Sequence, residues 1–317
     1  MKGEVCLVSL QSIFLKYLVR IIGRKRFWKN TGSNLQKKIK QRRKSIKVEP
    51  PVRLIKKLHI EKKEKNHHTY FEINPRQQKS DKHLLYFHGG GYVNGITKYH
   101  WDFIEKIAEE TKCSVTLPLY PLAPEYTYKD VFDFITPVYE QALTKRNPDN
   151  LIIMGDSAGG GMALALAQYL KEKKISQPKN IVLISPWLDI TLSNPDIVAI
   201  EKQDPFLAKS GAVEAGRMYA GKQDPLNYLI SPLYGDLKGL GKISMFIGTN
   251  DIMYPDTILL NRRIQEIGEQ SNYFEFQDMF HVFPLFSFPE ALHAKKQMIE
   301  IIQMNEASLQ SNNVHYF

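Results

Sequence analysis

The pentapeptide Gly155-Asp156-Ser157-Ala158-Gly159 contains the first residue that could act as a nucleophile. It follows an apolar run of strand length and precedes an Ala- and Leu-rich stretch that predicts a helix. So tight a strand-to-helix turn needs glycine on both sides of the serine, because side chains there would collide with neighbouring backbone. The turn would present the Ser157 hydroxyl at a helix N-terminus, where the helix dipole favours developing negative charge. A plain serine in a glycine-rich turn is the alternative interpretation.

Three consecutive glycines follow an earlier strand-like run, in the motif His88-Gly89-Gly90-Gly91-Tyr92. They let bare backbone approach a substrate and direct N–H groups at one point. Acyl transfer places negative charge on the former carbonyl oxygen, and each donor fixed there in advance contributes roughly 10²- to 10³-fold to the rate. We expect the N–H groups of Gly90, Gly91 and Ala158 to form this oxyanion hole. His88 is expected to make structural hydrogen bonds, and a flexible glycine linker is the alternative.

A serine nucleophile needs a base, and three histidines follow Ser157 in the chain. His281 comes directly after the last predicted strand, where a loop would lie over the strand ends. His293 falls inside a predicted helix and His315 in a terminal tail, and both positions favour solvated or structural roles. We therefore expect His281 to be the base.

The base in turn needs an orienting carboxylate, and Asp251 follows the predicted strand 244–247. A carboxylate at the carboxyl end of that strand can reach the imidazole of the base. Asp256 and Asp278 compete for the role. Asp256 lies at the predicted start of the next helix, where N-capping explains it, and Asp278 is expected to point elsewhere. Asp251 is therefore the expected acid.

Short apolar or β-branched runs alternate with longer helical patterns after Pro51. This alternation predicts an α/β protein with a mostly parallel sheet, covered by helices on both faces, that binds ligands at the carboxyl ends of its strands. Residues 58–61 and 69–73 predict an antiparallel hairpin at one edge, and the long segment 186–241 predicts an inserted helical layer. The other predicted strands are 84–87, 114–117, 151–154, 181–185, 244–247 and 273–276, and the predicted helices are 100–111, 130–145, 158–173, 256–268 and 289–303.

The formal charge of the 317-residue chain is +10, which by itself suggests nucleic acid or an anionic membrane as a partner. The excess lies in one segment. Residues 1–66 contain 20 Lys or Arg against 4 Asp or Glu, whereas the remainder is mildly acidic. With 43% hydrophobic and 24% charged residues, the composition excludes a disordered, collagen-like or coiled-coil chain. The basic character therefore belongs to the N-terminal part and not to the body.

The N-terminal arm, residues 1–50, begins with an amphipathic helical pattern that has a broad apolar side. A Lys- and Arg-rich stretch, 25–47, is broken at Gly32-Ser33 and ends at a Pro50-Pro51 boundary. We expect the arm to pack on the body, and the alternative is that residues 1–47 lie on an anionic membrane surface. Nucleic acid is not an expected partner, because few aromatic residues and no recognised binding motif accompany these charges.

The cysteines and the N-terminus indicate a cytoplasmic protein. Cys6 and Cys113 cannot form a disulfide framework in a chain of this length, and no Cys or His cluster offers a metal site. The uncharged run 5–15 is interrupted by polar residues and precedes no small-residue cleavage site. It is also shorter than the about 20 apolar residues that span a bilayer. If the arm binds a membrane, that membrane surface is the inner face.

Taken together, the motifs resemble the hormone-sensitive-lipase-like carboxylesterase family of the α/β-hydrolase superfamily, over about Leu84 to Ile302. Several motifs in the right order are far more specific than any one of them. Besides those already named, they are Tyr120-Pro-Leu-Ala-Pro-Glu125, Ser185-Pro-Trp-Leu-Asp189, Asp204-Pro-Phe206 and Phe280-His-Val-Phe283. Two departures remove no catalytic group: Tyr120-Pro121 replaces the family's usual Tyr-Arg, and the usual proline after Asp251 is missing.

The resemblance implies an α/β-hydrolase fold in which an eight-stranded, mostly parallel sheet carries a helical cap. The cap would combine the N-terminal arm with an insertion at about 190–238, and the catalytic domain would be 51–317. The resemblance also implies hydrolysis of small-molecule carboxylic esters, with short to medium acyl chains, and no metal or cofactor. A pocket beneath the cap would be lined by aromatic residues, for which we name Tyr92, Phe206 and Phe280.

In the expected mechanism His281 accepts the Ser157 proton as the hydroxyl attacks the ester carbonyl, while Asp251 stabilises the imidazolium. Water then repeats the sequence on the acyl-enzyme and releases the acid. Two alternatives stay open. An amidase, deacetylase or thioesterase uses the same triad, and a non-catalytic ligand-binding homologue shares the fold but typically lacks the histidine.

Overall fold

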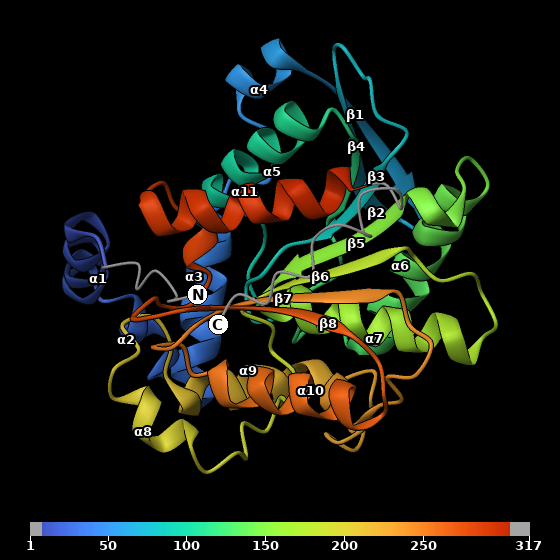
Figure 1. Cartoon of the computed structure of the whole chain (residues 1–317). Helices are drawn as coiled ribbons and strands as arrows, with labels where there is room; N and C mark the ends of the chain where they lie inside the picture. The colour runs from blue at the N-terminus through green and yellow to red at the C-terminus, as the bar shows by residue number, and fades with distance from the viewer. Residues whose placement is uncertain (1–7, 305–317) are drawn as a thin grey trace, which may run out of the picture.

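An eight-stranded sheet forms the centre of the computed structural model, which describes residues 8–304 (Figure 1). Its strand order is β1-β2-β4-β3-β5-β6-β7-β8. The β1–β2 and β2–β4 pairs are antiparallel and all other neighbours are parallel, which confirms the predicted sheet and its edge hairpin. The strands are β1 (Leu58–Lys65), β2 (His68–Pro75), β3 (His83–Phe87), β4 (Ser114–Pro118), β5 (Leu151–Asp156), β6 (Asn180–Ile184), β7 (Lys242–Gly248) and β8 (Ser271–Phe276).

Helices cover both faces of the sheet, and this explains why its central strands are continuous apolar runs. Every residue of β3, β4 and β5 is buried. In Figure 1, α5 and α11 lie on one face, and α6, α7 and α10 lie on the other; each face has its own apolar cluster. These helices are α5 (Lys98–Thr111), α6 (Tyr128–Leu143), α7 (Ala158–Glu172), α10 (Tyr254–Glu266) and α11 (Pro289–Gln303).

The N-terminal arm and the insertion after β6 meet at the carboxyl ends of the strands. Leu35 and Ile39 of the arm are buried in the cluster that includes α6 and α7. The hydroxyl of Ser210 in the insertion donates to the carbonyl oxygen of Trp28 at 3.4 Å. The arm contains α1 (Leu10–Ile22), α2 (Arg24–Trp28) and α3 (Gly32–Ser45), is followed by α4 (Val52–Lys57), and packs on an insertion that contains α8 (Ile197–Glu201) and α9 (Lys209–Ala220).

The break in the basic stretch lies slightly earlier than the sequence predicts. Gly32 and Ser33 do not interrupt a helix; they begin α3, and the chain leaves helical geometry before them, at the extended residue Thr31. Within residues 8–304 no helix is both long enough and apolar enough to cross a membrane. Cys6 and His315 lie outside the described residues.

Candidate active site

Ser157 occupies a strained turn between β5 and α7. Its backbone has φ 54° and ψ −121°, a conformation that L-residues rarely adopt. Neither flanking glycine has room for a side chain: a Cβ on Gly155 would collide with the carbonyl group of Gly159, and one on Gly159 would collide with the carbonyl group of Phe87. The two glycines therefore allow the turn to form, and the turn lifts the Ser157 hydroxyl off the end of the sheet.

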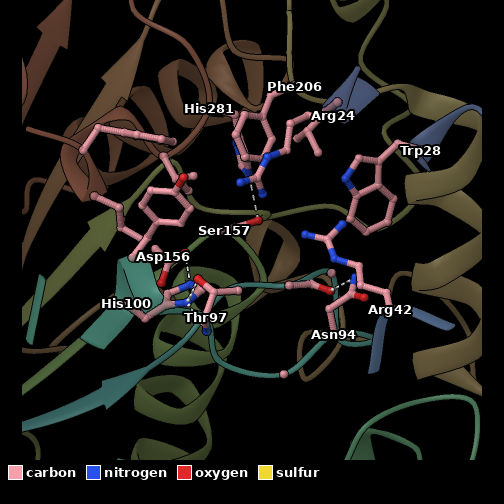
Figure 2. A pocket seen from close by; sticks show the side chains of 18 residues that line it. Arg24, Trp28, Arg42, Asn94, Thr97, His100, Asp156, Ser157, Phe206 and His281 are labelled. Carbon is pink, nitrogen blue, oxygen red and sulfur yellow. Dashed lines mark hydrogen bonds and ion pairs between the residues drawn. The ribbon is translucent and has the colours of Figure 1, made fainter. Parts of the chain in front are cut away.

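A continuous chain of hydrogen bonds joins Ser157, His281 and Asp251 (Figure 2 shows the first of them). The Ser157 hydroxyl donates to Nε2 of His281 at 2.8 Å. In that tautomer, Nδ1–H of His281 donates to both carboxylate oxygens of Asp251, at 3.0 and 2.9 Å. All three side chains are buried. The structure thus brings together three residues from three separate segments of the chain. Along the hydrogen bonds they follow one another as Ser157, His281 and Asp251, the arrangement of a nucleophile, a base and an acid.

The environment of His281 favours its protonated form. Burial acts to lower the pKa of the imidazole, but the charge and hydrogen bonds of Asp251, helped by the charges of Asp204 and Asp156, outweigh it and raise that pKa above 6.5. An imidazole tuned in this way accepts a proton from a hydroxyl readily and is held in place while it carries the charge. His281 is therefore equipped to act as a general base.

Asp204 is a further buried carboxylate that supports the acid. It accepts the backbone N–H groups of Phe206 and Leu207 at 2.6 and 3.0 Å, and that of Ile252 at 3.1 Å. Burial and the charge of Asp251 raise the pKa of Asp204 to about 6. Because Ile252 directly follows Asp251, this carboxylate ties the insertion to the loop that carries the acid. The sequence signal for it was its place in the Asp204-Pro-Phe206 motif.

The three expected oxyanion donors lie around the serine. Gly90 and Gly91 line the same pocket as Ser157, with φ values of 134° and 63° that favour glycine. Ala158 is the first residue of α7, so its N–H has no acceptor within the helix. Among the described residues, none of these three N–H groups donates to another protein atom. They remain available to a substrate oxygen.

The remaining motif residues hold the two loops together behind the serine. Asp156 accepts hydrogen bonds from the Tyr86 hydroxyl at 2.6 Å and from the Gly89 N–H at 2.9 Å. The ring of His88 stacks on Tyr120 and its Nδ1–H donates to the carbonyl of Gly89 at 2.7 Å. Burial, with repulsion from the nearby imidazole of His100, lowers the pKa of His88 to about 4, so the ring is neutral.

The competing acids and bases lie in other environments. Asp256 is in the first turn of α10 rather than at its N-cap, and accepts a hydrogen bond from Asn194 at 3.0 Å. Asp278 accepts from the Asn250 side chain at 3.0 Å and lies 3.9 Å from the ammonium group of Lys16. His293 is exposed on α11. None of the three forms part of the hydrogen-bond chain from Ser157.

The pocket above Ser157 has a volume of about 620 Å³ and is lined partly as expected. Phe206 lines it. Tyr92 does not, because its ring is buried in a stack, 3.7 Å from the ring of Tyr219. Phe280 does not either, because it lies behind Phe206 in an aromatic cluster of the core, with its ring centroid 6.5 Å from that of Phe206.

The N-terminal arm supplies pocket residues that the sequence did not single out. Trp28, Arg24 and Arg42 all line the pocket, and Figure 2 shows them on the side facing Ser157. A Cβ on Gly91 would collide with the indole of Trp28, so the glycine run also makes room for the arm. The only sequence signal was the high density of basic residues in this stretch, which does not indicate which of them point inward.

Comparisons with known proteins agree with this geometry. Residues 84–285 match a family described by the alpha/beta hydrolase fold. An esterase of Acinetobacter venetianus is 30% identical over 229 residues, which cover 71% of this chain and 75% of that protein. An acetyl-hydrolase of Streptomyces hygroscopicus is 27% identical over 217 residues, covering 68% of this chain and 72% of that one.

Solved structures extend the likeness to most of the chain. A crystal of EstE5 soaked with p-nitrophenyl butyrate matches this structure with a TM-score of 0.83 at 25% identity, covering 93% of this chain and 98% of that one. The residues of the family match include Ser157, Asp251 and His281, whereas the N-terminal arm precedes them. Ser157, Asp251 and His281 therefore lie within the family match, and the arm lies outside that match.

Proposed function

This chain belongs to the α/β-hydrolase fold family, and from that membership we propose that Ser157, His281 and Asp251 are the catalytic triad of a carboxylic ester hydrolase. The esterase and acetyl-hydrolase relatives make the chain a serine carboxylesterase-like enzyme, and they favour esters over the amides or thioesters that the same triad can cleave. The observation that carries the residue assignment is the continuous hydrogen-bond chain from Ser157 Oγ to the Asp251 carboxylate within one pocket.

Each step of the reaction has a group in place. His281 Nε2 takes the proton as Ser157 Oγ attacks the ester carbonyl, and the Asp251 carboxylate stabilises the imidazolium. The N–H groups of Gly90, Gly91 and Ala158 hold the oxyanion of the tetrahedral intermediate. His281 then gives its proton to the leaving alcohol, and a water molecule repeats the cycle on the acyl-enzyme to release the acid. The residues that act on the substrate need no metal or cofactor for this sequence.

The lining of the pocket supports short to medium acyl chains. Phe206 and Phe286 line it together with Ser157, and its volume of about 620 Å³ includes open space at the mouth, so the enclosed part is smaller. The test is a series of p-nitrophenyl esters from acetate to palmitate on the purified protein. We expect kcat/KM to be highest between acetate and hexanoate and to fall steeply for longer chains. Hydrolysis of p-nitroacetanilide in preference to the acetate ester, or no turnover in the whole series, would contradict the assignment.

We also propose that the N-terminal arm, residues 1–50, and the insertion at about 190–238 together form a cap on the catalytic domain, residues 51–317. Trp28 of the arm and Leu207 of the insertion line the same pocket as Ser157. The cap excludes water from the acyl site, which strengthens the electrostatic interactions on which the mechanism depends.

The first helix of this arm turns its apolar side outward. Its inward side carries the buried Val19 together with polar contacts. The hydroxyl of Ser9 donates to Glu290 at 2.9 Å, and Arg20 donates to the carbonyl of Gln203 at 3.0 Å. Three of its large apolar residues, Leu10, Phe14 and Ile21, are 83%, 69% and 76% exposed. The full exposed set is Leu10, Ile13, Phe14, Tyr17, Leu18, Ile21 and Ile22. An apolar helix face on the surface is typical of an interaction site.

We propose that this face lies on the surface of an anionic membrane. A bilayer accepts apolar and aromatic side chains at its interface, and the surplus of 20 basic over 4 acidic residues in 1–66 complements anionic headgroups. A location in the cytoplasm, at the inner face of the membrane, agrees with Cys113, which is buried and unpaired. Docking by α1 would also place Arg24, at the pocket, close to the lipid surface.

Replacing Phe14 and Ile21 together by Ser should weaken binding to vesicles of phosphatidylcholine with phosphatidylglycerol by at least about tenfold, because each side chain loses apolar burial of roughly 1.5–3 kcal/mol. Vesicle co-sedimentation measures this. Leu259→Ser, an exposed apolar residue on α10, is the matched control and should change nothing. Undiminished vesicle binding by the double variant, or a wild-type dimer that the variant abolishes, would argue against a membrane partner.

A further inference from the structure

Two arginines of the N-terminal arm point into the pocket of Ser157 without a carboxylate partner. Arg24 is the first residue of α2, and Arg42 lies in the last turn of α3. Both line the pocket, and Figure 2 shows both guanidinium groups projecting into it. Among the described residues, no Asp or Glu forms an ion pair with either guanidinium. Two cations therefore lie at the pocket with no anion between them.

Neighbouring basic residues of the arm are used differently. Arg43 follows Arg42 in the chain, and its guanidinium pairs with Glu125 at 2.6 Å and donates to the carbonyl of Val93 at 2.7 Å. Lys25 follows Arg24, and its ammonium group donates to the carbonyl of Asp204 at 2.9 Å. Basic residues that pack the arm on the body thus have carboxylate or carbonyl oxygens as hydrogen-bond acceptors. Among the described residues, the guanidinium groups of Arg24 and Arg42 have none.

Aromatic rings hold the two guanidinium groups in position instead. The guanidinium carbon of Arg42 lies 4.9 Å from the ring centroid of Phe27, and that of Arg24 lies 5.4 Å from the ring centroid of Phe206. Stacking on an aromatic face orients a guanidinium and leaves the N–H groups on its edge free to donate. The rings thereby position the donors before a ligand arrives.

The electrostatics of the pocket favour an anion. Burial and the positive charge of Arg24 lower the pKa of Arg42 to about 10, which still leaves the group charged at neutral pH. A half-buried cation next to a like charge is stabilised electrostatically when an anion binds between the two. Asp156, an acid that lines the pocket, is already bonded to Tyr86 and Gly89 and lies 3.4 Å from the imidazole of His100.

We propose that Arg24 and Arg42 form an anion subsite, so that the preferred substrate is a carboxylic ester that carries a second, negatively charged oxygen group. Carboxylates and phosphates both match the N–H edge of a guanidinium and are the two candidates. This inference rests on the proposed ester hydrolysis. The charged group is not changed in the reaction: the ester bond is broken by water, and the subsite positions the substrate.

The test compares three p-nitrophenyl esters with acyl chains of equal carbon number. They are the hexanoate, which is neutral, the adipate half-ester, which ends in a carboxylate, and 6-(phosphonooxy)hexanoate, which ends in a phosphate. We expect kcat/KM to favour at least one charged ester over the hexanoate, more strongly at low salt. The order of the two charged esters identifies the anion. If the wild-type protein has a lower kcat/KM for both charged esters than for the hexanoate, the proposal is overturned.

Substitution of the arginines should remove the preference. In Arg24→Gln and in Arg42→Gln we expect the ratio of kcat/KM for the charged ester to that for hexanoate to fall roughly tenfold to a hundredfold, the effect of losing a charge-assisted hydrogen bond. Arg42→Met keeps an apolar contact with Phe27 and guards against misfolding of the Gln variant. Arg26→Gln, on the same short helix but exposed, is the matched control and should leave the ratio unchanged. An unchanged ratio in the folded Arg24 and Arg42 variants means that both residues are structural.

A binding measurement separates this inference from the proposed reaction. Calorimetric titration with adipate and with 6-(phosphonooxy)hexanoate, the acids that hydrolysis would release, requires no turnover. We expect the favoured acid to bind the wild-type protein, with affinity lowered about tenfold or more in each arginine variant. Binding without hydrolysis of any ester would contradict the proposed function and retain the subsite. Hydrolysis of the esters, with neither binding nor preference dependent on the arginines, would support the proposed function and contradict the subsite.

Discussion

Ser157→Ala is expected to lower kcat for p-nitrophenyl butyrate by roughly 10⁴- to 10⁶-fold, the range typical of a lost triad nucleophile. The physical reason is that, within residues 8–304, the Ser157 hydroxyl is the only nucleophilic group hydrogen-bonded to His281 Nε2, at 2.8 Å. The oxyanion donors remain in the variant and account for the residual rate. Steady-state release of p-nitrophenol measures the loss, and circular dichroism verifies the fold.

The same substitution permits a sharper test of the triad. Residues that act as one unit give strongly non-additive losses, so Ser157→Ala combined with His281→Ala should be about as inactive as either single variant. Ser231→Ala removes another buried serine hydroxyl, one that accepts the Ile190 N–H, and serves as control. Retained esterase activity in Ser157→Ala, or losses that multiply in the double variant, would mean that these two side chains do not cooperate.

Asp251→Asn is expected to lower kcat/KM by roughly 10³- to 10⁴-fold. The carboxylate now accepts Nδ1–H of His281 through both oxygens, at 3.0 and 2.9 Å. An amide can present its own N–H to Nδ1, which favours the tautomer in which Nε2 carries the proton and cannot act as a base. Asp256→Asn changes a buried carboxylate outside the triad and is the matched control. Loss of activity in the Asp256 variant with full activity in the Asp251 variant would reverse the assignment.

The pH dependence provides a second readout of the same variant. Catalysis requires neutral His281, so kcat/KM should rise with pH through the pKa of that residue in the free enzyme. Because Asp251 and its neighbours raise this pKa above the usual value of an imidazole, the acid limb of the wild-type profile should lie at higher pH than that of a free histidine. In Asp251→Asn the largest raising charge is gone, while burial and the weaker effects of Asp204 and Asp156 remain, so the limb should move to lower pH. A limb that is the same in both proteins would show that Asp251 does not interact with the titrating base.

Local patterns in the sequence were sufficient to predict the fold and to choose Ser157, Asp251 and His281 as the candidate reacting groups. Strand runs such as 84–87 and 151–154 are buried on both faces, and that burial requires them to be continuously apolar. The glycines of the serine turn are fixed by contacts within a few residues or with the adjacent strand, as the collision of a Gly159 Cβ with Phe87 shows. His281 and Asp251 could be chosen because both follow strands that end at the same edge of a parallel sheet.

The sequence did not predict which side chains line the pocket or which side of the first helix faces the body. The tertiary structure was needed for both. The helical pattern of 10–22 shows an apolar and a polar side, but contacts with distant residues such as Glu290 place the side of Ser9 and Ser12 against the body. Tyr92 and Phe280 have the composition of pocket residues, yet stacking and core packing bury both.

The sequence motifs alone were enough to predict ester hydrolysis, with a serine, a histidine and an aspartate at the ends of parallel strands and glycine backbone donors beside them. The direction of Arg24 and Arg42 into the pocket, on which the proposed anion subsite rests, became evident only from the packing of the folded chain. Arg24 and Arg42 are two among many basic residues in the chain, and their place beside Ser157 follows from how the arm packs against the insertion. Side chains that meet across long separations in sequence are set by this packing, and no local pattern encodes it.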